Sequence, residues 1–121
     1  MGQGRGRAVG VDSIYGMVDL MILQILQREG PQHGLGIAEA IHRISGTELS
    51  VKDSALYPAL RRLEEQGRIE GEWKVSERGR RARFYDLTPA GRRYLKRATR
   101  EWARRVGAIG RVLGFGKVEF P

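Results

Sequence analysis

The chain has 121 residues, a length that fits one domain with a core of its own. It contains no cysteine, which excludes disulfides, thiolate metal sites and cysteine nucleophiles. No stretch resembles a secretory signal, and the longest apolar run, over residues 17–26, is too short to span a bilayer. We therefore expect a cytoplasmic protein with no membrane partner.

The formal net charge of +8 is unevenly distributed along the chain. Residues 88–113 include eight basic side chains and one acidic one, and a second basic cluster holds Arg78, Arg80, Arg81 and Arg83. Clustered Lys and Arg side chains neutralise phosphates, so nucleic acid is the first partner to expect. Charge alone leaves two alternatives open, an anionic membrane surface and a surface that is merely solubilising.

The N-terminal third predicts an arm and two helices. Residues 1–12 are rich in Gly and Arg without periodicity, which predicts a flexible basic arm. From Ser13 to the Gly30-Pro31 break, apolar residues recur at helical spacing around most of the circumference, so this helix should be buried on more than one side. A second helix is expected over 35–44, preceded by His33 as a turn or N-cap residue. Residues 47–49 are expected to form a short connecting strand.

A third helix is predicted by three leucines at i, i+4 and i+7, namely Leu56, Leu60 and Leu63. Residues 50–53 have the spacing of a capping box, which would start this helix at Val51. Pro58 would then lie well inside it, where a proline loses a hydrogen bond and clashes with the preceding turn. The helix is therefore either kinked at Pro58 or begins effectively near Ser54, and the sequence leaves both open.

The polar side of the third helix supplies candidate DNA contacts, and they are Lys52, Ser54, Ala55, Tyr57, Pro58 and Arg61. Ser54 and Tyr57 are expected to face base edges or phosphates, and Arg61 can bind a phosphate or a guanine edge. The alternative for Tyr57 is core packing with its hydroxyl bonded to backbone. Arg62 and Glu65 are expected to form a solvated pair.

A β-hairpin with a basic tip should follow. Alternation over 69–76 predicts a half-buried strand whose inner face carries Ile69, Gly71, Trp73 and Val75. A turn at 77–79 and a returning strand over 83–87 complete the hairpin, whose DNA-contacting candidates are Lys74, Arg78, Arg80, Arg81 and Arg83. Three helices and such a hairpin make a winged helix-turn-helix over 13–87, a mainly α fold with a small β-hairpin (α+β).

A last helix is expected over 88–113, with Thr88 as N-cap and Pro89 at the first position, before a tail over 114–121. Its length of roughly 37 Å exceeds what a small winged helix needs to cover itself. We expect its apolar side to form a dimer interface through Tyr94, Leu95, Ala98, Trp102, Val106, Ile109 and Leu113. A helix folded back over its own domain and a membrane-surface helix are the alternatives. Trp102 is either an interface anchor or the wall of a slot for a small aromatic effector.

Four segments together resemble the PadR-type transcriptional regulators: Met17-Val-Asp-Leu-Met-Ile-Leu-Gln-Ile-Leu26, Gly30-Pro-Gln-His-Gly-Leu-Gly-Ile37, Ala55-Leu-Tyr-Pro-Ala-Leu-Arg-Arg-Leu-Glu64 and Tyr85-Asp-Leu-Thr-Pro-Ala-Gly91. The single C-terminal helix is similar to that of the short members. Leu35 and the Ser54-Ala55 pair depart from residues frequent in the family, without loss of size class or hydrogen-bonding type. The resemblance implies a homodimeric winged-helix repressor whose C-terminal helices make the dimer. It also implies an inverted-repeat operator near its own or a neighbouring promoter, and it is compatible with a small aromatic effector, whose existence the sequence leaves open.

An enzyme is the opposed hypothesis, and the sequence gives it little support. Glu39 and His42 have the Glu-x-x-His spacing of a helical-bundle metal site, but the motif occurs once and His42 is better explained as a surface or cap residue. We expect no catalytic residues, no metal site and no cofactor. A third hypothesis is a basic protein that binds DNA or RNA without sequence preference or regulation. It differs from a regulator in specificity, because a regulator should prefer one inverted repeat over bulk DNA by orders of magnitude.

Overall fold

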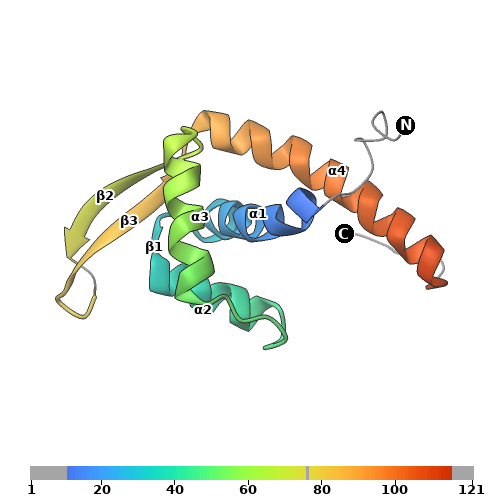
Figure 1. The fold of residues 1–121 in the computed structure, drawn as a ribbon. Coiled ribbons are helices and arrows are strands. Elements are labelled where there is room, and N and C mark those ends of the chain that lie inside the picture. The colour runs from blue at the N-terminus through green and yellow to red at the C-terminus, as the bar shows by residue number, and fades with distance from the viewer. Residues whose placement is uncertain (1–10, 76, 116–121) are drawn as a thin grey trace.

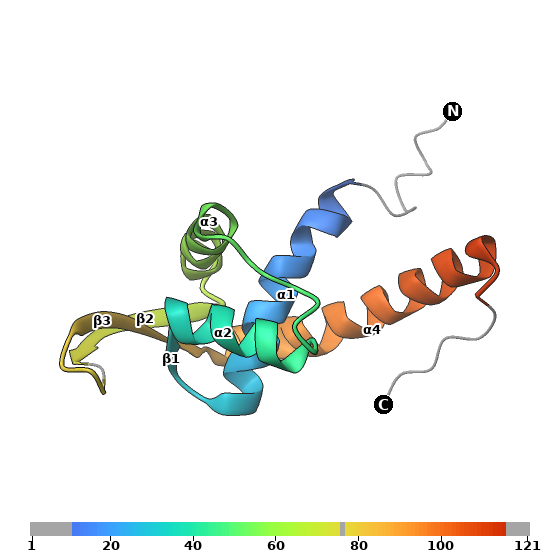
Figure 2. The ribbon, with the colours of Figure 1, turned by 90° about the horizontal axis from the view of Figure 1, so that it is seen from below.

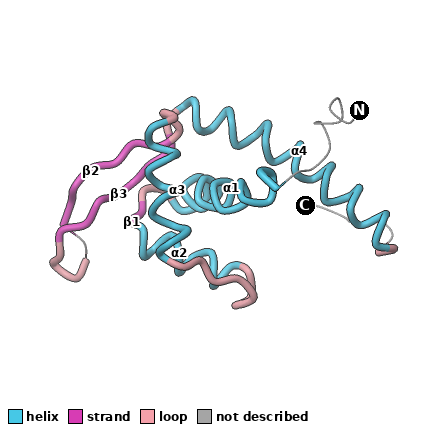
Figure 3. Tube along the Cα trace, viewed as in Figure 1, coloured by secondary structure: helices cyan, strands magenta, loops and turns pink. Residues whose placement is uncertain are grey.

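The computed structural model describes residues 11–75 and 77–115. Helices and strands follow one another as α1 (Val11–Glu29), β1 (Gln32–His33), α2 (Gly34–Ile44), α3 (Asp53–Glu65), β2 (Ile69–Val75), β3 (Arg81–Leu87) and α4 (Pro89–Leu113) (Figures 1 and 3). The predicted winged helix with a long last helix is confirmed. The helix α1 begins at Val11, two residues earlier than predicted, and residues 1–10 of the predicted arm and 116–121 of the tail lie outside the described residues.

The core forms around α1, which contacts α2, α3, α4 and β3. Ile22, Leu23 and Leu26 of α1 are fully buried against apolar side chains such as Ile37 of α2 and Leu60 of α3. Burying a side chain of this size stabilises the fold by about 1.5–3 kcal/mol. The prediction that the first helix is buried on more than one side is confirmed.

The sheet has three antiparallel strands in the order β1-β3-β2, one strand more than the predicted hairpin. The added strand β1 is only two residues long and pairs Gln32 with Tyr85 and His33 with Phe84. His33 is also the N-cap of α2, as predicted, because its Nδ1 accepts a hydrogen bond from the Gly36 amide at 3.1 Å. Its ring meets the Phe84 ring edge-on, with centroids 5.1 Å apart. His33 therefore joins the sheet to the start of α2.

The connecting strand predicted at 47–49 is wrong, since this segment is a loop. The Leu49 amide donates to Ser45 Oγ, and the Leu49 carbonyl accepts from His42 Nδ1. Side chains at the C-terminal end of α2, His42 and the C-cap Ser45, thus satisfy backbone groups of Leu49 that a strand would have paired. His42 is exposed, which agrees with its interpretation as a surface residue.

The hairpin β2–β3 projects beyond the helices, as Figures 1 and 2 show. For that reason the predicted half-buried face of β2 is wrong at its outer end: Ile69 is buried and Gly71 is half-buried, whereas Trp73 is 54% exposed and Val75 is exposed too. The return strand also begins at Arg81, two residues earlier than predicted. The hairpin consequently extends outward, and only the end next to the helices, with Ile69, belongs to the core.

The helix α4 begins as predicted, with Thr88 as N-cap and Pro89 at the first position, and has 25 residues. Thr88 Oγ1 accepts from the Gly91 amide at 3.0 Å and donates to the Gly67 carbonyl at 2.6 Å. The Thr88 amide donates to the Arg68 carbonyl at 3.1 Å. The Thr-Pro-Ala-Gly segment thus fastens the start of α4 to the turn that ends α3.

Replacing Gly91 by Ala should destabilise the protein, because a Cβ there would overlap the backbone carbonyl of Arg68. A backbone atom cannot rotate away as a side chain can, so we expect the full overpacking cost of about 1–3 kcal/mol. A lower urea-unfolding midpoint with an unchanged slope would report this loss.

Gly107, in the same helix, supplies the matched control. A Cβ at Gly107 would have Arg111 Nη1 at 3.8 Å as its nearest neighbour, which is ordinary contact. Gly107→Ala should therefore stabilise by up to about 1 kcal/mol through helix propensity alone. Equal behaviour of the two variants would contradict the close packing assigned to Gly91.

Candidate nucleic-acid interface

The helix α3 begins at Asp53, with Lys52 as an N-cap that makes no side-chain capping bond. The capping box predicted from Ser50 is therefore wrong, and the start near Ser54 is the better of the two predictions. Pro58 is the sixth residue of the helix and exposed. Its missing amide leaves the Ser54 carbonyl without the usual helical donor, and the exposed surface lets solvent or a ligand supply one.

The exposed side of α3 carries the residues predicted to contact DNA. Leu56, Ala59, Leu60 and Leu63 are buried, whereas Lys52, Ser54, Ala55, Tyr57, Pro58 and Arg61 are exposed. Tyr57 is 45% exposed, which rules out the core-packing alternative. One edge of its ring lies over Gly34, where an added Cβ would sit 3.0 Å from Cε1. Tyr57 is therefore held against the start of α2 through Cε1 and its hydroxyl oxygen, and nearly half of the residue stays exposed.

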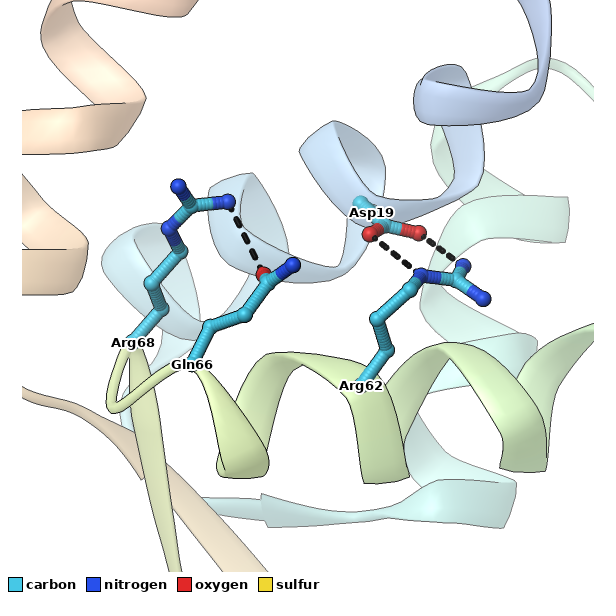
Figure 4. Close-up of polar contacts among 4 residues, drawn as sticks. All are labelled: Asp19, Arg62, Gln66 and Arg68. Atoms are coloured by element: carbon cyan, nitrogen blue, oxygen red, sulfur yellow. Dashed lines mark hydrogen bonds and ion pairs between the residues drawn. The ribbon is translucent and has the colours of Figure 1, made fainter. Parts of the chain in front are cut away.

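Arg62 does not form the predicted solvated pair with Glu65. It donates to both carboxylate oxygens of Asp19 in α1, at 2.6 and 3.1 Å (Figure 4). Asp19 is only 8% exposed, so this pair anchors α3 to the core helix, and the hydrogen bond to Asp19 raises the pKa of Arg62. We therefore infer that Arg62 orients α3 on the core helix α1.

Arg83 of β3 reaches across β2 to α3. Its Nη2 donates to Glu64 Oε2 at 2.5 Å, and this hydrogen bond raises the pKa of Arg83. The path crosses Gly71 of β2, where an added Cβ would lie 2.6 Å from Arg83 Nε. The absence of a side chain at Gly71 therefore allows the hairpin and α3 to be joined by an ion pair. Sequence reasoning missed Glu64 and Gly71, although a glycine inside an alternating strand signals close approach of another group.

The hairpin holds its remaining cations over aromatic rings or at its tip. The Arg81 guanidinium lies 4.8 Å from the centroid of the Trp73 ring, and Lys74 Nζ lies 5.8 Å from that of Phe84. Arg78 and Arg80 are exposed on either side of Gly79, whose φ of +77° makes the turn. Trp73 and Phe84 thus make cation–π contacts with Arg81 and Lys74, and both cations stay exposed.

Residues 11–75 and 77–115 contain no group of three or more His, Asp or Glu side chains that could hold a metal ion. Across the same residues, no helix is long and apolar enough to cross a membrane.

Comparison with known proteins agrees with this arrangement. Residues 22–97 match the family described as the transcriptional regulator PadR-like family. A transcriptional regulator from Clostridium thermocellum has 32% sequence identity and a TM-score of 0.72, with 86% of this chain and 97% of that chain covered. The structure of Bacillus subtilis PadR in complex with operator DNA has 28% identity and a TM-score of 0.58, over 66% of this chain and 45% of that one. An uncharacterised protein of Lysinibacillus sphaericus is 32% identical over 93 residues, which are 76% of this chain and 84% of that protein. The chain belongs to the PadR-like family of transcriptional regulators.

Proposed function

We propose that the protein is a homodimeric repressor that binds an inverted-repeat operator through α3 and the β2–β3 hairpin. The observation that carries the proposal is the exposed polar side of α3, with Ser54, Tyr57 and Arg61, next to an outward hairpin rich in arginine. A helix of this kind enters the major groove, where side chains distinguish base pairs, while a basic hairpin binds the sugar–phosphate backbone. The related PadR structure with operator DNA supports this assignment.

Dimerisation through α4 is the second element of the proposal. Leu95 and Ala98 are buried within the protomer, and the Arg68 guanidinium lies 3.5 Å from the centroid of the Tyr94 ring. The interface is therefore proposed for the far half of α4, through Trp102, Val106, Ile109 and Leu113. A two-fold dimer would place the two α3 helices about 34–36 Å apart, in successive major grooves.

Selection of binding sites from random DNA at physiological salt tests the proposal. We expect one inverted repeat, with a preference over bulk DNA of at least about a thousandfold. A promoter carrying that repeat should lose transcription when the protein is supplied. Recovery of no preferred sequence would instead support the alternative of a general DNA- or RNA-binding protein, and increased transcription would make the protein an activator.

Replacing Arg80 and Arg81 by Ala should weaken binding to the operator and to unrelated DNA alike, because phosphate contacts carry no sequence information. The slope of log Kd against log salt should fall by about 0.9 for each phosphate that the variant no longer neutralises. Titrations at several salt concentrations measure both effects. An unchanged slope would remove the hairpin from the interface.

The third element of the proposal is a small planar aromatic effector whose binding releases the protein from its operator. Trp102 is half-buried on the apolar side of α4, where a two-fold axis could bring it near its mate. In a Trp73→Phe variant, which leaves Trp102 as the single tryptophan, flat aromatic compounds should quench the fluorescence and release operator DNA. If no member of a broad panel quenches it, Trp102 is an interface anchor only.

A further inference from the structure

The helix α4 has a basic face, defined here by Arg92, Arg93, Lys96, Arg97, Arg100 and Arg104. At 100° per residue these six side chains fall within an arc of about 140°. All six are exposed, and they lie opposite Gly91, Leu95 and Ala98, which pack against the core. The basic face therefore points away from the protein body along about three turns of helix.

The charges of this face are not balanced within the protomer. Arg92 donates to the Gln27 side chain at 3.5 Å, and the Arg97 guanidinium lies 5.6 Å from the Tyr94 ring centroid. Among the described residues, no carboxylate forms an ion pair with the six cations. Like charges at i and i+4, such as Arg100 and Arg104, destabilise a helix by about 0.2–0.5 kcal/mol each. A solubilising surface normally mixes both signs, so this face fits an anionic partner.

We propose that the basic face of α4 binds the phosphate backbone of a second segment of duplex DNA, separate from the segment held by α3 and the hairpin. The first turn of α4 meets the turn after α3, and the helix then leads away from the hairpin, with α1 between α3 and the body of α4 (Figures 1 and 2). A straight duplex on the exposed side of α3 would not follow this course. A groove lined by Gln24, Gln27, Arg92 and Lys96 borders the face, and its amide side chains can donate to phosphates.

Two other anionic partners fit the surroundings less well. A helix that binds a membrane surface buries its apolar side in lipid, but the core of the protomer already takes Leu95 and Ala98. Single-stranded RNA binds where bases stack on open aromatic rings. Tyr94, at the edge of the basic face, is instead covered by the Arg68 guanidinium. A duplex backbone needs neither an apolar side nor an aromatic platform.

A capture experiment tests the inference with the full chain and the triple variant Arg93→Gln, Arg100→Gln, Arg104→Gln. A duplex long enough for both protomers is immobilised and saturated with protein, and a labelled duplex of unrelated sequence is then added at low salt. The wild-type protein should retain the second duplex. The variant should retain at least about tenfold less of it, since its salt slope for this step falls by about 2 to 3 when three phosphates are no longer neutralised. Its affinity for the immobilised duplex should stay within twofold of the wild type.

The reciprocal control is Arg78→Gln, Arg80→Gln, Arg81→Gln. It should weaken binding to the first duplex and leave unchanged the amount of second duplex captured per molecule of bound protein. Unchanged capture by the α4 variant would overturn the inference, as would an equal loss of affinity for both duplexes. Binding of the wild type to vesicles of anionic lipid, abolished in the α4 variant while DNA capture is retained, would assign the face to a membrane. The inference depends on the charge of α4 and not on operator recognition, so site selection and second-duplex capture can fail independently.

Discussion

Exchanging the charges of Glu64 and Arg83 should restore the DNA affinity that either single reversal removes. The two side chains join α3 to the hairpin, the two parts proposed to contact DNA, through a 2.5 Å ion pair. Arg83→Glu or Glu64→Arg alone places like charges face to face and turns the hairpin away from α3. We expect each single reversal to weaken operator binding by at least about tenfold, and the double variant to return to within about threefold of the wild type. Fluorescence anisotropy with the selected operator measures all four affinities.

The charge exchange separates a positioning role of Arg83 from the direct phosphate binding predicted from the sequence. If Arg83 bound a phosphate directly, every variant without Arg83 would lack that interaction. Adding Glu64→Arg to Arg83→Glu would then not rescue the affinity. The salt slope of both variants would be lower by about 0.9. Arg81→Glu is the matched control, because Arg81 lies over Trp73 and has no ion pair with Glu64 among the described residues. Glu64→Arg should leave the weakened binding of Arg81→Glu uncorrected. Failure of the exchange to rescue Arg83→Glu would return Arg83 to the DNA surface.

The exchange concerns a contact that the sequence could not reveal. Apolar periodicity predicted the helices because burial follows a repeat of 3.6 residues, as at Leu56, Leu60 and Leu63. Thr88 and Pro89 marked the start of α4 through short-range rules of capping. The partners of Arg62 and Arg83 lie 43 and 19 residues away in the chain. A local pattern shows that such a residue is charged but not which carboxylate it meets.

The exposure of residues in the hairpin also depends on contacts that a local sequence pattern does not show. Alternation over 69–75 predicts two faces of a strand, but what covers each face depends on where the hairpin ends relative to the helices. The body covers Ile69 and does not reach Trp73 or Val75, so Arg81 and Arg83 cover the Trp73 ring instead. The two-residue strand β1 is too short for any alternation to be detected. The polar side of α3 was predicted well because exposure there follows from the helix's own apolar side.

Substituting Asp for both Ile109 and Leu113 should produce a folded monomer that no longer binds the operator tightly. These side chains are 41% and 61% exposed at the far end of α4, so a charge there leaves the protomer core untouched. In the proposed dimer the same two positions are buried against the partner, where an unpaired carboxylate is costly. Light scattering should report the monomer mass, and circular dichroism should report unchanged helix content.

Operator affinity should fall by at least about a hundredfold in this variant, because each protomer then binds its half-site without the effective concentration that the dimer provides. Weak binding to a single half-site should persist, since α3 and the hairpin lie at the other end of the molecule (Figure 2). Leu49→Asp is the matched control: Leu49 is an exposed leucine of the α2–α3 loop, and its replacement should leave the dimer intact. A double variant that remains dimeric would move the interface away from the far half of α4. A monomer with full operator affinity would instead show that one protomer suffices, and the inverted repeat would lose its physical basis.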